Sequence, residues 1–141
     1  MATHYHAYQW TGPTAQLDQA DELRRPPASG GTEVFTTSAL PPFRLCDWLR
    51  KPRARIARTF ATSAEAVAWL AARYDETAPS FLYPDQEAKI GKDFRLENAG
   101  RDLTGGVDVC WGFHLKGERY AHLAVICCPN RHAPDHPCPA G

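Results

Sequence analysis

"VDVCWGFHLKGERYAHLAVIC", residues 107–127, carries the strongest structural signal in the chain. Two runs in which apolar side chains alternate with other side chains flank a short turn at residues 116–118, a pattern typical of a β-hairpin. A three-residue turn pairs Trp111 with Leu123, and the apolar side chains of both strands then share one face. The opposite face carries the side chains that alternate with them: Asp108, Cys110, His114, Tyr120 and His122. We therefore predict an antiparallel hairpin at 107–127 with one buried face.

The clearest helical signal precedes the hairpin in "TSAEAVAWLAARYDE", residues 62–76. Thr62 and Glu65 match a capping box, in which the hydroxyl and the carboxylate bind exposed amides of the first turn. Apolar side chains recur at helical spacing and predict the buried stripe: Val67, Leu70, Ala71 and Tyr74. Pro79 ends the helix.

The remaining segments have shorter signals. Alternating aromatic residues predict a strand at 4–10, and the composition of 33–37 predicts a short edge strand. Gly-Pro, Pro-Pro and Gly-Gly pairs predict a long exposed loop at 11–32 with a helical turn inside it. Residues 43–51 favour two helical turns, and 54–60 favours an extended segment.

The stretch 80–106 is ambiguous between helix and strand. Residues 81–83 have the composition of a short strand, and 86–96 fits either a weak helix or a further strand. Residues 97–106, which are polar and contain three glycines at positions 100, 105 and 106, are interpreted as a connector.

These elements predict an α+β fold, with a small antiparallel sheet of three to five strands and one principal helix packed on it. A chain of 141 residues is long enough to bury a core as one domain. We assign that domain to residues 1–128. Residues 129–141 form a tail rich in proline, cysteine and histidine.

The composition excludes a strong global electrostatic attraction to nucleic acid or membrane, because sixteen basic residues balance sixteen acidic ones. The N-terminus lacks the pattern of a signal peptide, and no apolar run approaches the roughly 18 residues of a spanning helix. We therefore expect a cytoplasmic protein without a membrane segment, in which the five cysteines are thiols. Arginine outnumbers lysine, which is typical of a GC-rich, actinobacterial-like genome.

The tail "CCPNRHAPDHPCPAG" concentrates five possible metal ligands: Cys127, Cys128, His132, His136 and Cys138. Zinc prefers four thiolate and imidazole ligands in a tetrahedron, so zinc is the predicted cofactor. Adjacent cysteines point to opposite sides of a strand, which leaves only one of Cys127 and Cys128 facing the metal. Pro134 argues against a helix carrying both histidines, and the chain has no CxxC pair. There are two alternatives to a metal site. Cys127 and Cys128 could end a buried strand that is followed by an exposed tail, or the cysteines could form a redox disulfide.

Two other groups of side chains have the residue types of a site. His4 and His6 share one face of the first predicted strand and could bind a metal, although a polar edge strand has the same appearance. On the hairpin, Cys110, His114 and His122 offer a nucleophile and bases for catalysis, although the solvent-exposed face of a hairpin often has this composition.

Positive charge is concentrated between positions 44 and 58. The candidate nucleic-acid contacts are Arg44, Arg50, Lys51, Arg53, Arg55 and Arg58. Arginine binds phosphate, and the nearby Trp48 could stack on a base. A charged strand edge that prevents aggregation explains the same residues.

The sequence thus predicts a small cytoplasmic zinc-binding accessory or binding module that contacts nucleic acid or a protein partner. One alternative is an enzyme that uses a metal or the Cys/His side chains on a small molecule. Another is a structural or assembly protein without a metal.

Overall fold

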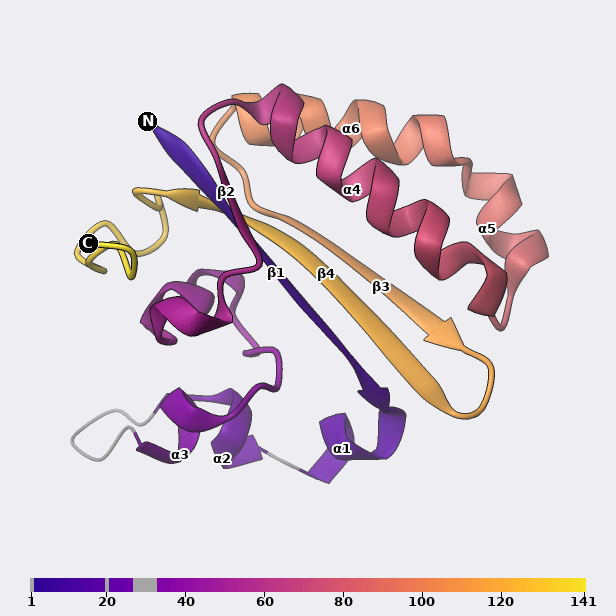
Figure 1. The fold of residues 1–141 in the computed structure, drawn as a ribbon, viewed down its shortest axis with the longest axis horizontal. Helices are drawn as coiled ribbons and strands as arrows, with labels where there is room; N and C mark the ends of the chain where they lie inside the picture. Colours follow the sequence, from indigo (N-terminus) through magenta and orange to yellow (C-terminus); the bar gives the residue numbers. More distant parts are fainter. Residues whose placement is uncertain (1, 20, 27–32) are drawn as a thin grey trace.

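The computed structural model describes residues 2–19, 21–26 and 33–141. Its centre is a four-stranded antiparallel sheet in the order β2-β1-β4-β3. The strands are β1 (His4–Pro13), β2 (Arg58–Phe60), β3 (Val109–Leu115) and β4 (Arg119–Cys128). Helices pack against this sheet, which confirms the predicted α+β fold (Figure 1).

The hairpin has the predicted register. Trp111 is paired with Leu123, and Leu115 is paired with Arg119 across a three-residue turn. The side chains of β3 alternate strictly between buried and exposed, because every second residue points into the core. Cys127 and Cys128, at the end of β4, consequently enter two different hydrophobic clusters on opposite faces of the sheet.

The principal helix is α4 (Ser63–Thr77), and its predicted cap is present. Thr62 Oγ1 accepts a hydrogen bond from the backbone N–H of Glu65 at 3.2 Å. The buried side chains of α4 are Ala66, Trp69, Leu70 and Tyr74. The stripe is thus rotated slightly from the predicted one, since the helix also packs against a second helix beside it.

That second helix was missed by the sequence prediction. Residues 97–106 were expected to form a connector, but most of them belong to α6 (Lys92–Thr104), which follows α5 (Pro84–Ile90). The prediction was wrong because α6 buries only a narrow stripe, Ala99 and Leu103, and is otherwise polar. Figure 1 shows α4 and α6 running alongside each other over the same face of the sheet.

An ion pair holds α5 to the other two helices. Arg95 donates two hydrogen bonds to the carboxylate of Glu87, at 2.6 and 2.7 Å, and the Tyr74 hydroxyl donates a third at 2.9 Å. Glu87 is only 7% exposed, so these hydrogen bonds replace the contacts with water that its carboxylate loses on burial. Burial, together with the hydrogen bond to Glu87, raises the pKa of Tyr74 to about 12.

The opposite face of the sheet is covered by residues that precede α4. The predicted helical turns at 43–51 form a 3₁₀ helix, η1 (Leu45–Arg50). Its Trp48 stacks on Tyr8 of β1, with 4.5 Å between ring centroids. Trp48 and Leu49 complete a second core with apolar side chains of β4: Ala124, Ile126 and Cys128. A second short 3₁₀ turn, η2 (Arg53–Arg55), then leads to β2.

The segment expected as a loop at 11–32 is partly regular. It contains the end of β1, α1 (Thr14–Gln19) and α2 (Asp21–Arg24), while residues 20 and 27–32 lie outside the described residues. The strand expected at 33–37 is instead a short helix, α3 (Glu33–Thr37). The helix is stabilised there because Phe35 is buried, and because Lys51 and Arg55 donate hydrogen bonds to the carbonyls of Phe35 and Thr37.

A third 3₁₀ turn, η3 (Ala78–Ser80), joins α4 to the residues before α5. Within the described residues, no helix combines the length and apolar character needed to cross a membrane.

Candidate metal site

The sheet brings three of the candidate ligands to one end of the molecule. His4 and His6 are two residues apart in β1 and point to the same face. β1 pairs with β4 so that His4 lies opposite Cys128, whose side chain also points to that face. The imidazole rings of His4 and His6 meet edge to face, with 4.8 Å between their centroids.

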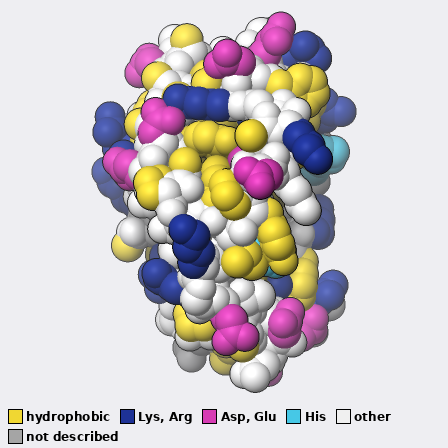
Figure 2. Space-filling view, turned by 90° about the vertical axis from the view of Figure 1, so that its right-hand side faces the viewer, with side chains coloured by type: hydrophobic (Ala, Val, Ile, Leu, Met, Phe, Trp, Pro, Cys, Tyr) yellow, Lys and Arg dark blue, Asp and Glu magenta, His cyan; other side chains and the backbone are white. Residues whose placement is uncertain are grey.

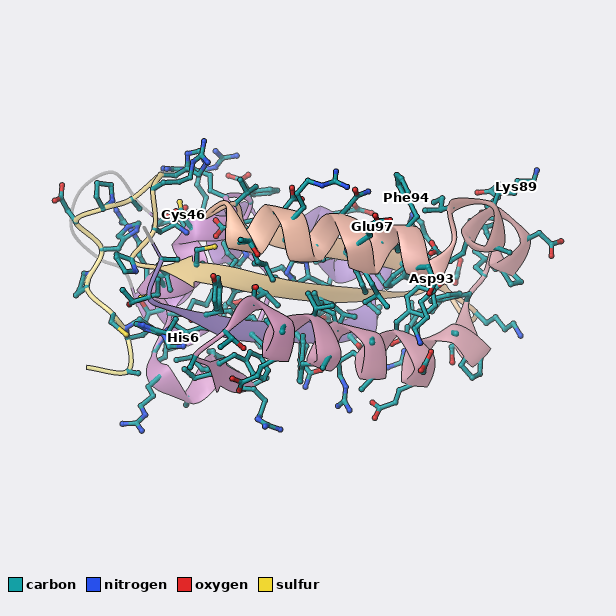
Figure 3. All side chains as sticks on the ribbon, turned by 90° about the horizontal axis from the view of Figure 1, so that it is seen from above. His6, Cys46, Lys89, Asp93, Phe94 and Glu97 are labelled. Atoms are coloured by element: carbon teal, nitrogen blue, oxygen red, sulfur yellow. The ribbon has the colours of Figure 1, made fainter. Side chains whose placement is uncertain are left out.

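The tail supplies the fourth ligand because it turns back over this end of the sheet. Asn130 anchors the turn, since its side-chain amide donates to the Asp108 carboxylate at 2.9 and 3.0 Å. The same amide donates to the backbone carbonyl of Cys127 at 3.1 Å. Backbone hydrogen bonds from Ala133 to Asn130 and from His136 to Ala133 continue the turn. Figure 3 shows the tail and His6 at the same end of the molecule, opposite Lys89.

The four ligand atoms converge. One atom each from His4, His6, Cys128 and Cys138, which we call the four-ligand site, lies within 4.8 Å of the other three. Cys138 Sγ is 3.4 Å from Nε2 of His6 and 3.5 Å from Nε2 of His4. A tetrahedron built with ordinary zinc bond lengths separates nitrogen and sulfur ligands by about 3.6 Å. The spacing therefore suits a tetrahedral metal ion.

Each histidine is oriented by a threonine. His6 Nδ1 lies 2.8 Å from the Thr59 hydroxyl, and His4 Nδ1 lies 3.1 Å from the Thr3 hydroxyl. The Thr3 hydroxyl donates its proton to the carbonyl of Cys128, so it accepts from the N–H at Nδ1 of His4. This leaves the lone pair of His4 on Nε2, toward Cys138. Such a hydrogen bond at the second ring nitrogen is typical of metal-binding histidines.

Burial keeps His6 and Cys128 uncharged when no metal is bound. It lowers the pKa of His6 to about 4, with a further contribution from His4, so the imidazole is neutral near pH 7. Burial, followed by the contact with Cys138, raises the pKa of the Cys128 thiol to about 12. A neutral imidazole can bind a metal directly, whereas a thiol must first lose its proton, which a metal ion promotes.

The buried hydroxyl of Tyr8 lies near the thiols of the four-ligand site. Tyr8 is fully buried, and among the described residues its hydroxyl has no hydrogen-bond partner. Burial raises its pKa, and the neighbouring thiols of Cys128 and Cys138 raise it further. A buried hydroxyl without a partner costs free energy, so this end of the sheet is not fully satisfied by the described protein atoms.

The remaining candidate ligands of the tail lie elsewhere. Cys127 is buried in the core under α4 and α6, and its backbone N–H donates to Asp108. His132 is exposed and lines a cavity of about 410 Å³ together with Cys46 and Asp108. His136 joins a separate group with Cys46 and Asp47. Of the five tail residues, the structure brings Cys128 and Cys138 together with His4 and His6.

The hairpin candidates share one cavity. Cys110, His114 and His122 line a space of about 380 Å³ together with Tyr120 and Arg24. However, Trp48 donates its indole N–H to Nε2 of His122 at 3.1 Å, so the neutral ring carries its proton on Nδ1, 3.7 Å from Cys110 Sγ. In this tautomer His122 donates toward the thiol and cannot accept its proton.

The pKa values of this pair agree with that geometry. Burial lowers the pKa of His122 to about 4, with a smaller contribution from Arg24. Loss of solvation raises the pKa of Cys110 to about 11. Both groups are uncharged near pH 7, unlike the thiolate–imidazolium pair of an activated cysteine nucleophile.

The basic stretch is only partly available to a ligand. Arg44, Arg50, Arg53 and Arg58 are exposed, and Arg55 is half-buried. Lys51 is 1% exposed and donates to the carbonyls of Phe35 and Ser38, both at 2.8 Å. Burial lowers its pKa to about 8. Trp48, expected to stack on a base, is also buried.

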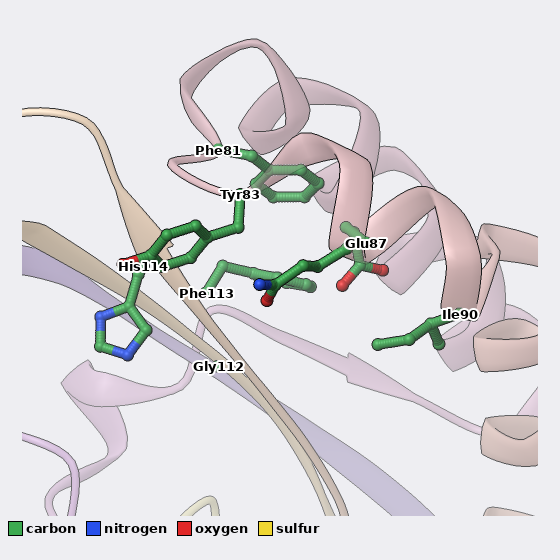
Figure 4. A pocket seen from close by; sticks show the side chains of 8 residues that line it. Phe81, Tyr83, Glu87, Ile90, Gly112, Phe113 and His114 are labelled. Atoms are coloured by element: carbon green, nitrogen blue, oxygen red, sulfur yellow. The ribbon is translucent and has the colours of Figure 1, made fainter.

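The end of the molecule opposite the tail has a different surface. A pocket of about 150 Å³ lies between α5 and β3, lined by Phe81, Tyr83, Glu87, Ile90 and His114 among others (Figure 4). Glu87 is already paired with Arg95 and Tyr74. Leu82, Tyr83, Ile90 and Phe94 are exposed in this region. Figure 2, which faces this end, shows hydrophobic side chains among charged ones.

Comparison with known proteins adds no assignment. No protein-family model, no curated protein and no solved structure matches the chain. The geometry of the site therefore carries the functional argument.

Proposed function

We propose that the chain is a cytoplasmic accessory module that holds one zinc ion at the four-ligand site. Two imidazoles and two thiolates are a usual ligand set of structural zinc. The single observation that carries the proposal is the convergence of His4, His6, Cys128 and Cys138. These residues come from opposite ends of the chain, so the fold, and not their closeness in sequence, brings them together.

The zinc ion has a structural role in this proposal. Four protein ligands complete a tetrahedron and leave no position for a substrate. The ion binds the start of β1, the end of β4 and the tail together. Loss of the ion would remove one attachment of the tail, which is also held by the hydrogen bonds of Asn130 and by the hydrogen bond from Arg50 to His136.

The preferred partner of the module is another protein. The exposed apolar side chains of Leu82, Tyr83, Ile90 and Phe94 support this choice. Nucleic-acid binding by the 44–58 stretch is less favoured, since Lys51 and Trp48 are buried. An oligonucleotide mobility shift that is salt-dependent and abolished in the Arg53→Ala/Arg58→Ala variant would reverse this preference.

The zinc proposal is tested by metal analysis of protein from zinc-supplied cells after dialysis against a weak chelator. We expect about one zinc ion per chain, because four ligands hold the ion tightly. Cys128→Ala and His6→Ala should lose the ion. Replacement of zinc by Co²⁺ should give strong thiolate-to-cobalt absorption in the wild type.

The chain offers matched controls. Cys127→Ala removes the adjacent thiol, which faces the other side of the sheet, and should retain zinc. His132→Ala removes an exposed histidine of the same tail and should also retain it. Wild-type protein with less than about a tenth of an equivalent of zinc would refute the proposal, and so would equal zinc loss in Cys127→Ala and Cys128→Ala.

A further inference from the structure

A second group of ligand side chains lies at the same end of the molecule. Cys46 and Asp47 of η1 meet His136 of the tail, and one ligand atom of each lies within 4.8 Å of the other two. Cys46 is 4% exposed and Asp47 is 2% exposed. Figure 3 shows Cys46 at the tail end, where His6 also lies. We call these three residues the three-ligand site.

Two polar atoms of this group are buried without a hydrogen bond: Oδ1 of Asp47 and Nδ1 of His136. Such atoms are uncommon, because removing them from water costs free energy unless a partner replaces it. In the described part of the chain only four buried side-chain atoms are in this state, and a third is the Tyr8 hydroxyl near the four-ligand site. Three of the four unsatisfied atoms thus lie at or near the two groups of ligands, and the fourth is Nε of Arg73 in α4.

Arg50 provides the positive charge beside the three-ligand site. Its Nε lies 3.6 Å from Asp47 Oδ1 and donates to Nε2 of His136. Its side chain is 44% exposed, so it can turn into solvent. A neutral imidazole carries one ring proton. A metal at Nδ1 moves that proton to Nε2, and a metal at Nε2 takes the acceptor itself. In both cases the contact with Arg50 must break.

We infer that Cys46, Asp47 and His136 form a second binding site for a divalent transition-metal ion of the zinc type. When the ion is absent, the positive charge of Arg50 lies against Asp47 and His136 in its place. One sulfur, one oxygen and one nitrogen ligand suit Zn²⁺ and Co²⁺. Three protein ligands leave a fourth coordination position for water. The site shares no ligand with the four-ligand site, although the tail contributes one or more residues to each.

The experiment is a Co²⁺ titration of protein whose four-ligand site has been filled with zinc and dialysed. Zinc binds such ligands more tightly than cobalt, so cobalt reports only the remaining site. We expect one further equivalent of Co²⁺ with thiolate-to-cobalt absorption. Cys46→Ala should abolish the absorption, and Asp47→Asn should weaken binding by at least about tenfold. Arg50→Gln should tighten it by about tenfold, because a competing charge is removed.

Cys110→Ala is the matched control, since Cys110 is an exposed thiol outside both sites, and it should leave the titration unchanged. Circular dichroism of each variant confirms folding, and Arg50→Gln tests the site with all three ligands in place. Absorption that is absent in wild type, or that persists in Cys46→Ala, would overturn the inference. If the four-ligand site does not bind zinc, a different result is expected: no zinc remains bound to the wild type after dialysis. The Cys128→Ala/Cys138→Ala variant then allows the titration without it.

Discussion

The two faces of the sheet bury polar groups in different ways. Under α4 and α6, the buried carboxylate of Glu87 is fully paired with Arg95 and Tyr74 inside an aromatic core. Under η1 and the tail, the buried polar groups include imidazoles and thiols, such as those of His6 and Cys128, which burial keeps uncharged. On the first face, protein atoms alone pair the buried charge. The second face has ligand atoms in place for a metal ion, so we expect its stability to depend on solution conditions.

The largest expected difference between the faces is the response to a chelator. Removing zinc should lower the free energy of unfolding by about 4 kcal/mol if free zinc exceeds the dissociation constant about 1,000-fold. Urea unfolding of zinc-loaded and chelated protein measures this change. Cys138→Ser should lose most of this response, because it removes a ligand of the four-ligand site. Identical unfolding curves for the wild type with and without chelator would contradict the prediction.

Arg95→Ala tests the face under α4 and α6. The change leaves the buried Glu87 carboxylate without its charged partner and should destabilise the protein by about 3–4 kcal/mol. The same loss is expected with and without zinc, as measured by urea unfolding. Arg101→Ala, an exposed change on the same helix, should alter stability by less than about 0.5 kcal/mol. Equal effects of the two changes would show that the ion pair is unimportant.

Trp48→Phe probes the middle of the other face. The variant removes the indole donor and leaves Nε2 of the buried His122 without a partner, at a cost of about 2 kcal/mol. Thermal or urea unfolding measures the loss. Because Trp48 is not a ligand at either metal site, and phenylalanine still fills the core beside Cys128, dialysis-stable zinc should be unchanged. A variant as stable as the wild type would mean that this hydrogen bond is not needed.

The pH dependence of stability should also come from the η1 face. The pKa of His122 is about 4 in the folded chain and about 6.5 in an unfolded one, so between these values the unfolded state binds more protons. Stability therefore falls as pH falls through this window, by about 1.4 kcal/mol per pH unit for this group. Comparing chelated wild type with His122→Gln at several pH values isolates the effect, and parallel curves for the two proteins would exclude it.

The smallest predicted effect belongs to the cap of α4. Thr62→Ala removes the acceptor for the N–H of Glu65 and should destabilise the protein by about 1 kcal/mol, independently of zinc and pH. Thr62→Ser keeps the hydroxyl and should be close to the wild type. A zinc-dependent loss in Thr62→Ala would indicate that the two faces are coupled.

Local patterns predicted the hairpin register, the α4 cap and the shared face of His4 and His6 correctly. They also placed Cys127 and Cys128 on opposite faces. Each of these features depends on periodicity within a few residues, because side chains alternate along a strand and the first turn of a helix has exposed amides. The polar helix α6 and the short helix α3 could not be predicted in this way, since their stability comes from contacts with distant residues.

Local sequence patterns could not predict which residues form the four-ligand site. The chain alone showed a strand with two histidines and a tail with cysteines and histidines, as separate possibilities. Their union depends on the pairing of β1 with β4 and on the return of the tail over Asn130, both of which are contacts between residues far apart in sequence. The same turn directs His136 toward Cys46 and Cys138 toward His6. Spacing along the chain specifies neither direction, because only the packed fold determines where the chain reverses.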